Sequence, residues 1–119
     1  GVPNRHYRIA KSQRTKYHSL CVMSNNFSTI LWNKFFTSLT KDFGIPTDAG
    51  MAFLQQTFKQ IRVAPTTALT GPLVRNDKNT LTANLNALKD DPFRHVYRAF
   101  IKTFAEEKGK SLDEYSNLC

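Results

Sequence analysis

The chain has 119 residues, a length that fits one domain with a hydrophobic core and needs no disulfide or metal to hold it. Hydrophobic residues make up 40% of the chain, which excludes a disordered tail, and no apolar run approaches the roughly 18 residues that a membrane span requires. The formal net charge of +8 points to an anionic partner or to a solvated basic segment.

The positive charge gathers at the beginning of the chain, where residues 1–15 are predicted to form a basic arm or an interdomain connector. The first sixteen residues contain no acid and five cations: Arg5, Arg8, Lys11, Arg14 and Lys16. Such an arm can neutralise nucleic-acid phosphates, join two domains, or face the phosphates of a dinucleotide. We favour the connector, because charge runs are most often solvated.

Residues 16–43 are predicted to form one long helix that opens the helical domain, which we place at residues 16–119. Apolar residues recur there at helical spacing: Leu20, Met23, Phe27, Leu31, Phe35, Leu39 and Phe43. Ile30, Trp32 and Phe36 widen this stripe, so the helix is expected to be mostly buried, either at the centre of the domain or in a subunit interface. Gly44 and Pro46 supply the expected stop.

Two further helices are predicted on either side of a polar connector. Thr47 is a candidate N-cap for a helix that stops before Pro65. Its predicted inward face consists of Met51, Leu54, Phe58 and Ile61. Asp77 is a candidate N-cap for the next helix, whose apolar side consists of Leu81, Leu85 and Leu88.

The last part of the chain predicts one more helix and a short final turn. Asp90-Asp91-Pro92 has the pattern of a cap followed by a first-turn proline. The predicted buried stripe consists of Phe93, Val96, Tyr97, Phe100, Ile101 and Phe104. Ser111 and Glu114 have capping-box spacing. Because no segment alternates like a strand, the fold is predicted to be all-α, a bundle of four to five helices with one long central helix.

The connector between residues 68 and 77 is the first candidate site. Gly71-Pro72 cannot continue a helix, so the chain must bend there. The bend carries a hydroxyl at Thr70, a cation at Arg75 and a carboxylate at Asp77, which can converge on one ligand or on a neighbouring domain. The alternative is that Asp77 only caps the next helix and Arg75 is its solvated neighbour.

The early turns of the long helix carry the second candidate site. Seven residues turn an α-helix by roughly 700 degrees, so His18 and Asn25 are predicted to share a face, with Asn26 one step away. Histidine carries protons near neutral pH, and asparagine amides orient carbonyl or hydroxyl groups. Redox chemistry at a C–O or C–N bond would use such groups. Alternatively, His18 is a surface residue and the asparagines bond locally.

Other catalytic signatures are missing from the sequence. There is no nucleophile elbow, zinc-protease helix, Walker sequence or dinucleotide-binding glycine fingerprint. The three histidines are scattered, and Cys21 and Cys119 lack metal-ligand spacing, so we predict no metal. With no recognisable secretory signal, both cysteines are expected to be free thiols in a reducing cytoplasm.

Two motifs carry a resemblance to a known family. Tyr17-His18 precedes Ser24-Asn25-Asn26-Phe27, and Ala68-Leu69-Thr70-Gly71-Pro72 precedes Arg75 and Asp77. In this order, across residues 14–104, they resemble the helical C-terminal domain of unknown function of Rossmann-type oxidoreductases related to 6-phosphogluconate dehydrogenase and pyrroline-5-carboxylate reductase. Two departures exist, because the family has Ser-Asn at Asn25-Asn26 and Gly at Asn76. Asn76 is therefore expected to take a left-handed conformation.

The resemblance implies an NADP- or NAD-dependent oxidoreductase that binds its cofactor mainly on an N-terminal Rossmann domain absent from this chain. It implies that His18 donates a proton or orients the substrate, and that Asn25, Asn26, Thr70 and Arg75 bind the substrate. Gly71, Pro72 and Asp77 would face the cofactor or the other domain. The expected partners are the Rossmann domain, a second copy of the chain and a small-molecule substrate, and the isolated chain would be inactive.

Two rival functions remain open at this point. A small basic helical domain that binds nucleic acid would use the arm and the positive charge, although no aromatic stacking platform or recognition helix accompanies them. A pure interaction module would show an apolar patch without a polar groove. We rank both behind the oxidoreductase domain.

Overall fold

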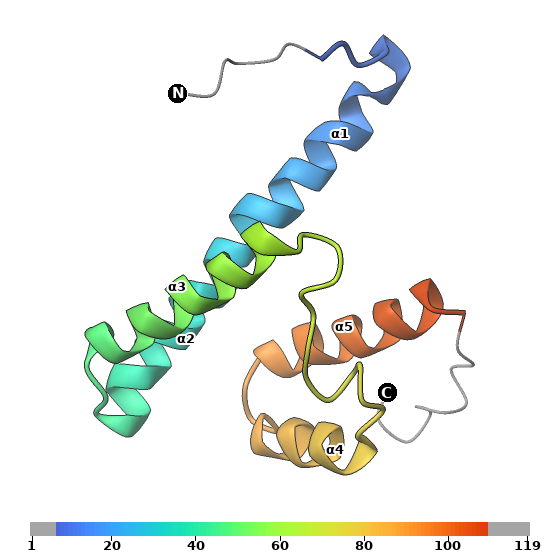
Figure 1. Ribbon diagram of the computed structural model, residues 1–119. Coiled ribbons are helices and arrows are strands. Elements are labelled where there is room, and N and C mark those ends of the chain that lie inside the picture. Colours follow the sequence, from blue (N-terminus) through green and yellow to red (C-terminus); the bar gives the residue numbers. More distant parts are fainter. Residues whose placement is uncertain (1–6, 110–119) are drawn as a thin grey trace. The chain divides into compact units, whose positions relative to one another are not determined.

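The computed structural model describes residues 7–109, and every regular element in that range is helical (Figure 1). The predicted all-α fold is therefore confirmed. The chain divides into two compact units, residues 1–63 and residues 64–119. The capping box predicted at Ser111 and the thiol of Cys119 lie outside the described residues.

The first unit is built on a helical segment that runs without interruption to Phe43. A 3-10 turn, Lys11–Gln13, leads into α1 (Arg14–Cys21), a π-helical turn (η2, Val22–Phe27) and α2 (Ser28–Phe43). The helix predicted over residues 16–43 is thus present, but it contains a wider turn that the apolar spacing does not reveal. Gly44 ends the segment with a φ of 63°, and its N–H donates to the carbonyl of Thr40 at 3.0 Å.

The returning helix α3 (Thr47–Val63) packs beside α2, as Figure 1 shows. Gly50 is buried at this contact, where an added Cβ would lie 2.8 Å from both Leu39 Cδ2 and Phe36 Cε1. Phe53 completes the contact, with its ring centroid 5.9 Å from that of Trp32 and 5.6 Å from that of Phe35. Glycine is needed here because a side chain would separate the two helices.

This contact corrects the predicted inward face of α3. Leu54 is half-buried, but Met51, Phe58 and Ile61 are 41%, 64% and 49% exposed. The face that meets α2 carries Gly50 and Phe53 instead, neither of which belonged to the predicted apolar stripe. Close approach at a glycine and aromatic packing decide the orientation of the helix, and simple hydrophobic spacing does not.

Burial along the long helical segment also differs from the prediction. None of the residues of α1, η2 or α2 is buried, so the expectation of a mostly buried helix is wrong for the single chain. The reason is that α3 covers one side only. Large apolar side chains consequently remain exposed along the segment, among them Leu20 (54%), Met23 (56%), Phe27 (51%) and Ile30 (50%).

The second unit is a pair of helices with a small buried core. The helices are α4 (Lys78–Ala87) and α5 (Phe93–Glu107). The core consists of Leu81, Leu85, Ile101 and Ala105, with Leu73 and Tyr97 packed against it. Leu81, Leu85 and Ile101 match the predicted stripes. Phe100 does not, because it is 55% exposed on the side of α5 that α4 leaves uncovered.

Polar contacts fix the two helices of the second unit. The amide of Asn84 donates to the hydroxyl of Tyr97 at 2.8 Å, and Nε of Arg94 donates to the carbonyl of Leu85 at 3.1 Å. Asp91 provides the predicted start of α5, since its carboxylate accepts from the N–H of Phe93 at 2.9 Å. Pro92 directly precedes the first helical residue, close to its predicted place.

Candidate functional site

The connector between α3 and α4 folds back on itself just before α4 begins. The N–H of Arg75 donates to the carbonyl of Gly71 at 3.2 Å, and the N–H of Asp77 donates to the carbonyl of Pro72 at 2.9 Å. Gly71 has a φ of 105°, a conformation that side-chain-bearing residues avoid. The predicted bend is present, and these bonds hold Arg75 and Asp77 at its end.

Asn76 has a φ of 55°, in the left-handed region, which confirms the expectation for this position. Asparagine tolerates this conformation better than most residues other than glycine, because its short polar side chain bonds locally. The left-handed residue turns the chain from the connector into α4. The conformation of Asn76 therefore sets how the backbone turns from Arg75 to Asp77, directly before α4 begins.

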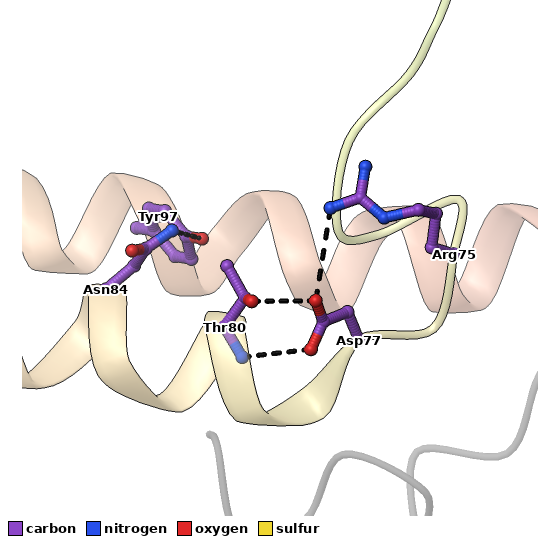
Figure 2. Close-up of polar contacts among 5 residues, drawn as sticks. All are labelled: Arg75, Asp77, Thr80, Asn84 and Tyr97. Carbon is purple, nitrogen blue, oxygen red and sulfur yellow. Dashed lines mark hydrogen bonds and ion pairs between the residues drawn. The ribbon is translucent and has the colours of Figure 1, made fainter.

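Asp77 is the N-cap of α4. One carboxylate oxygen accepts from the N–H of Thr80 at 3.1 Å, and the other accepts from the hydroxyl of Thr80 at 2.7 Å (Figure 2). The guanidinium of Arg75 lies 3.9 Å from the second oxygen. The hydroxyl of Thr80 lowers the pKa of Asp77 most, followed by its N–H and by the charge of Arg75. The capping alternative for Asp77 is thus confirmed.

Replacing Asp77 with alanine is expected to lower the melting temperature of the chain by roughly 3–8 °C, because α4 loses its cap. The native carboxyl titrates below its ordinary pKa of 3.8. Its stabilising effect is therefore complete above pH 3.8 and is lost as the pH falls through the lower folded value. Thermal melts followed by circular dichroism, at neutral and at acidic pH, measure both effects.

The control for this prediction is alanine at the exposed Asp90, which caps no helix in the described part of the chain. Asparagine at position 77 should restore most of the neutral-pH stability, because its side chain also accepts from the N–H of Thr80. Equal melting temperatures for the native chain and the alanine variant would contradict the role of the cap.

Thr80 was missed as part of the connector site, although its spacing of three residues from Asp77 is visible in the sequence. The hydroxyl and the N–H of Thr80 both donate to the carboxylate of Asp77, so each carboxylate oxygen already accepts a hydrogen bond from α4. Arg75 is different, since 61% of its side chain is exposed beside Asp77. Thr70 is also exposed, whereas Gly71 and Pro72 are half-buried.

A hollow of about 520 Å³ lies next to this bend within the second unit. It is lined by Thr66, Thr67, Leu69 and Val74 of the connector and by Phe104, Glu107 and Lys108 at the end of α5. None of the predicted site residues lines it. Leu69 and Val74 belong to the predicted connector, residues 68–77, and stand on either side of Thr70, Gly71 and Pro72, so the hollow borders these three residues.

The second candidate site coincides with the π-helical turn. Asn25 and Asn26 lie inside η2. His18 lies in α1, about one turn before η2 begins at Val22. A π-turn rotates less per residue than an α-turn, so Asn25 and Asn26 are displaced around the helix from the positions that regular rotation predicts. The shared face of His18 and Asn25 was inferred from regular rotation, which this turn does not follow.

The side chains of His18, Asn25 and Asn26 are exposed, and they have no hydrogen-bond partner among residues 7–109. The neighbouring hydroxyls bond the backbone instead: Thr29 donates to the carbonyl of Asn25 at 2.7 Å, and Ser24 donates to that of Cys21 at 3.3 Å. π-turns are rare and occur frequently at functional sites. The polar heads at this turn are therefore available to a ligand.

Tyr17 lies four residues before the half-buried, free thiol of Cys21 on the same helix. The hydrogen bond to Cys21 raises the pKa of the Tyr17 phenol most, followed by its charge interaction with the same group and by burial. This pair stands directly beside His18 and before the π-turn.

The predicted residues fall into two sets, one in each unit. His18, Asn25 and Asn26 belong to the first unit, and Thr70, Gly71, Pro72, Arg75 and Asp77 belong to the second. A single groove formed by both sets stays a prediction. Among the described residues, no group of three or more His, Cys, Asp or Glu side chains is arranged to hold a metal ion. Within the same residues, no helix is long and apolar enough to cross a membrane.

The fold and the two motifs define a helical domain, and comparison with known proteins gives its family. The chain belongs to the family described as "Domain of unknown function (DUF2520)", whose model matches residues 1–103. No curated protein matches it significantly.

One solved structure is similar in both fold and sequence. It is a crystal structure from Bacteroides fragilis described as a "putative NADP oxidoreductase", with a TM-score of 0.70 and 28% sequence identity. The match covers 87% of this chain but 40% of the other protein. The predicted resemblance to a helical domain of unknown function is confirmed, and this chain corresponds to less than half of the protein it resembles.

Proposed function

We propose that the chain is the substrate-facing and dimerisation domain of an NADP- or NAD-dependent oxidoreductase. The observation that carries the proposal is the match to part of a protein described as an NADP oxidoreductase. The length of that protein outside the match leaves room for a Rossmann domain. In this proposal residues 1–15 are the connector from that domain, and residues 16–119 are the helical domain.

The early turns of the first unit carry the proposed substrate side. His18 donates a proton to the substrate or orients it, and the amides of Asn25 and Asn26 hydrogen-bond its carbonyl or hydroxyl group. Support comes from their exposure, from their unengaged polar heads and from the π-turn that displays the two asparagines. The cofactor supplies the hydride when bound.

The connector carries the proposed cofactor side. Thr70 and Arg75 bind the substrate and close the cleft toward the cofactor, and Gly71, Pro72 and Asp77 face the cofactor or the other domain. Support comes from the exposure of the Arg75 guanidinium and of Thr70, which leaves a cation and a hydroxyl able to hydrogen-bond a substrate. The chain has no glycine-rich phosphate loop, so the main binding of NADP or NAD is assigned to the other domain.

Deleting the helical domain from a two-domain relative tests the proposal. Turnover of NADPH with a panel of small carbonyl and imine substrates is expected to disappear, while the remaining Rossmann domain keeps its affinity for NADP⁺. The isolated 119-residue chain should show no turnover. Steady-state NADPH oxidation and calorimetric titration measure the two properties separately. Full turnover by the Rossmann domain alone would refute a substrate-facing role for this chain.

A further inference from the structure

A hollow of about 590 Å³ opens near the beginning of the first unit, apart from the residues assigned above to the substrate. It is lined by Tyr7, Arg8, Ile9, Arg14 and Tyr17, and we call it the arginine–tyrosine hollow. Its walls come from residues 7–9, which precede the 3-10 turn, and from Arg14 and Tyr17 in the first turn of α1. Its size lies in the range of small-molecule sites.

The arginine–tyrosine hollow carries positive charge that the first unit does not neutralise. Its lining holds two guanidinium groups and no carboxylate. Arg8 and Arg14 are exposed and have no ion-pair partner among residues 7–109. Lys11 and Lys16 stand close to them in the sequence and add further positive charge.

The nearest acids along the chain are far away. The first acidic residue is Asp42, near the end of the uninterrupted helical segment that begins in the 3-10 turn. At a rise of 1.5 Å per residue, Asp42 lies about 40 Å from Arg14. Salt screens charges over about 8 Å under physiological conditions, so Asp42 does not offset the charge of the hollow.

The side chains that line the hollow match the chemistry of a phosphate ester. Guanidinium groups bind phosphate oxygens through paired, charge-assisted hydrogen bonds. The phenol of Tyr7 offers a further donor, and Tyr7 and Tyr17 each add an aromatic ring. Aromatic rings beside a cationic centre suit a ligand that joins a phosphate to a flat ring, as a nucleotide does.

We propose that the arginine–tyrosine hollow binds a phosphate group of a small soluble ligand, held by Arg8 and Arg14. The phosphate comes from the dinucleotide cofactor or from a phosphorylated substrate. This inference rests on the proposed function only for the source of the phosphate. The hollow itself is a feature of this chain, so the 119-residue chain alone is sufficient to test it.

Calorimetric titration of the chain with NADP⁺, NAD⁺ and inorganic phosphate, at low salt, is the test. We expect weak binding that falls by about tenfold or more in the double variant Arg8→Gln, Arg14→Gln, because two charge-assisted contacts are lost. The matched control is Lys41→Gln, Lys59→Gln, which changes the net charge equally at positions outside the hollow and should bind like the native chain.

The three probes identify the source of the phosphate. If NADP⁺ binds more tightly than NAD⁺, the hollow binds the extra phosphate of NADP⁺. If both bind equally, the hollow binds the pyrophosphate that they share. Binding of inorganic phosphate without a gain for either dinucleotide assigns a phosphorylated substrate. A further variant, Arg8→Lys with Arg14→Lys, keeps the charge but loses the paired geometry, so it should bind more weakly than the native chain and more tightly than the glutamine variant.

Three results would overturn the inference. In the first, the native chain binds none of the three probes. In the second, the Arg8→Gln, Arg14→Gln variant and the Lys41→Gln, Lys59→Gln control lose affinity equally. The third result is a DNA or RNA oligonucleotide that binds more tightly than NADP⁺ and displaces it. Circular dichroism confirms that the variants keep their helix content. If the native chain binds no phosphate while two-domain relatives still need the helical domain for turnover, this inference fails and the proposed function stands.

Discussion

Alanine at the position of His18, in a two-domain member of the DUF2520 family, is expected to lower kcat by about 100- to 10,000-fold. This range is what a positioned proton donor contributes to a reaction. The imidazole is exposed and unengaged one turn before η2, where it can reach a bound substrate. The affinity for NADP⁺ should be unchanged, because the proposed function assigns cofactor binding mainly to a Rossmann domain and not to His18.

Separate measurement of kcat and of the dissociation constant for NADP⁺ distinguishes this role from a loss of folding. The matched control is alanine at the position of His95, another exposed histidine, which lies in α5 of the second unit. The control should keep full turnover. Turnover that is unchanged in the His18 variant would remove this residue from the mechanism.

Glutamate at Leu20 and Ile30 is expected to convert a dimer of the chain into monomers. The two side chains are 54% and 50% exposed on the long helical segment, and we propose that a second copy covers them. An uncompensated charge in an apolar interface costs several kcal/mol, so the dimer should dissociate at least about 100-fold more readily. Sedimentation equilibrium over a range of concentrations measures the change.

The control for the dimer is Asn33→Glu, which adds a carboxylate at a polar, exposed position of the same helix. It should dimerise like the native chain. A native chain that stays monomeric at high concentration would contradict the proposed dimerisation, and the exposed apolar side chains would then be assigned to the Rossmann domain.

Helix ends and caps could be predicted well from the sequence because they depend on local chemistry. The left-handed Gly44, the capping carboxylate of Asp77 and the carboxylate of Asp91 each act within four residues of their partners. Asn76 is a similar case, since a turn conformation is a property of the residue and its neighbours. These features need no knowledge of the tertiary structure.

Helix faces were harder to predict because they depend on the partner. Gly50 is neither apolar in the usual sense nor part of a stripe, yet it lies where α2 and α3 come closest. Phe100 fits the helical period of α5 but is 55% exposed and does not belong to the core that α4 and α5 share. Periodicity indicates which residues could be buried, and packing decides which of them are.

The candidate site could be predicted as residue types and motifs but not as one geometry. Arg75 is exposed at the connector as expected, while Asp77 is engaged by Thr80, which sequence reasoning had overlooked. The residue types of Val22–Phe27 do not predict a π-turn, because a π-turn differs from an α-turn in its backbone hydrogen bonds. The geometry between the two sets depends on how the two units dock, which residue types and motifs do not determine.

The π-turn changes the orientation of α2 residues relative to α1 residues around the common helix axis. A π-turn behaves as an α-helix that holds one additional residue, so every residue after Phe27 is out of phase with those before Val22. A relative with a regular helix would therefore match either α1 or α2 in orientation, but not both. A gap of one position inside this helix, in an alignment of the chain with such a relative, would then mark a change in which side chains face the ligand.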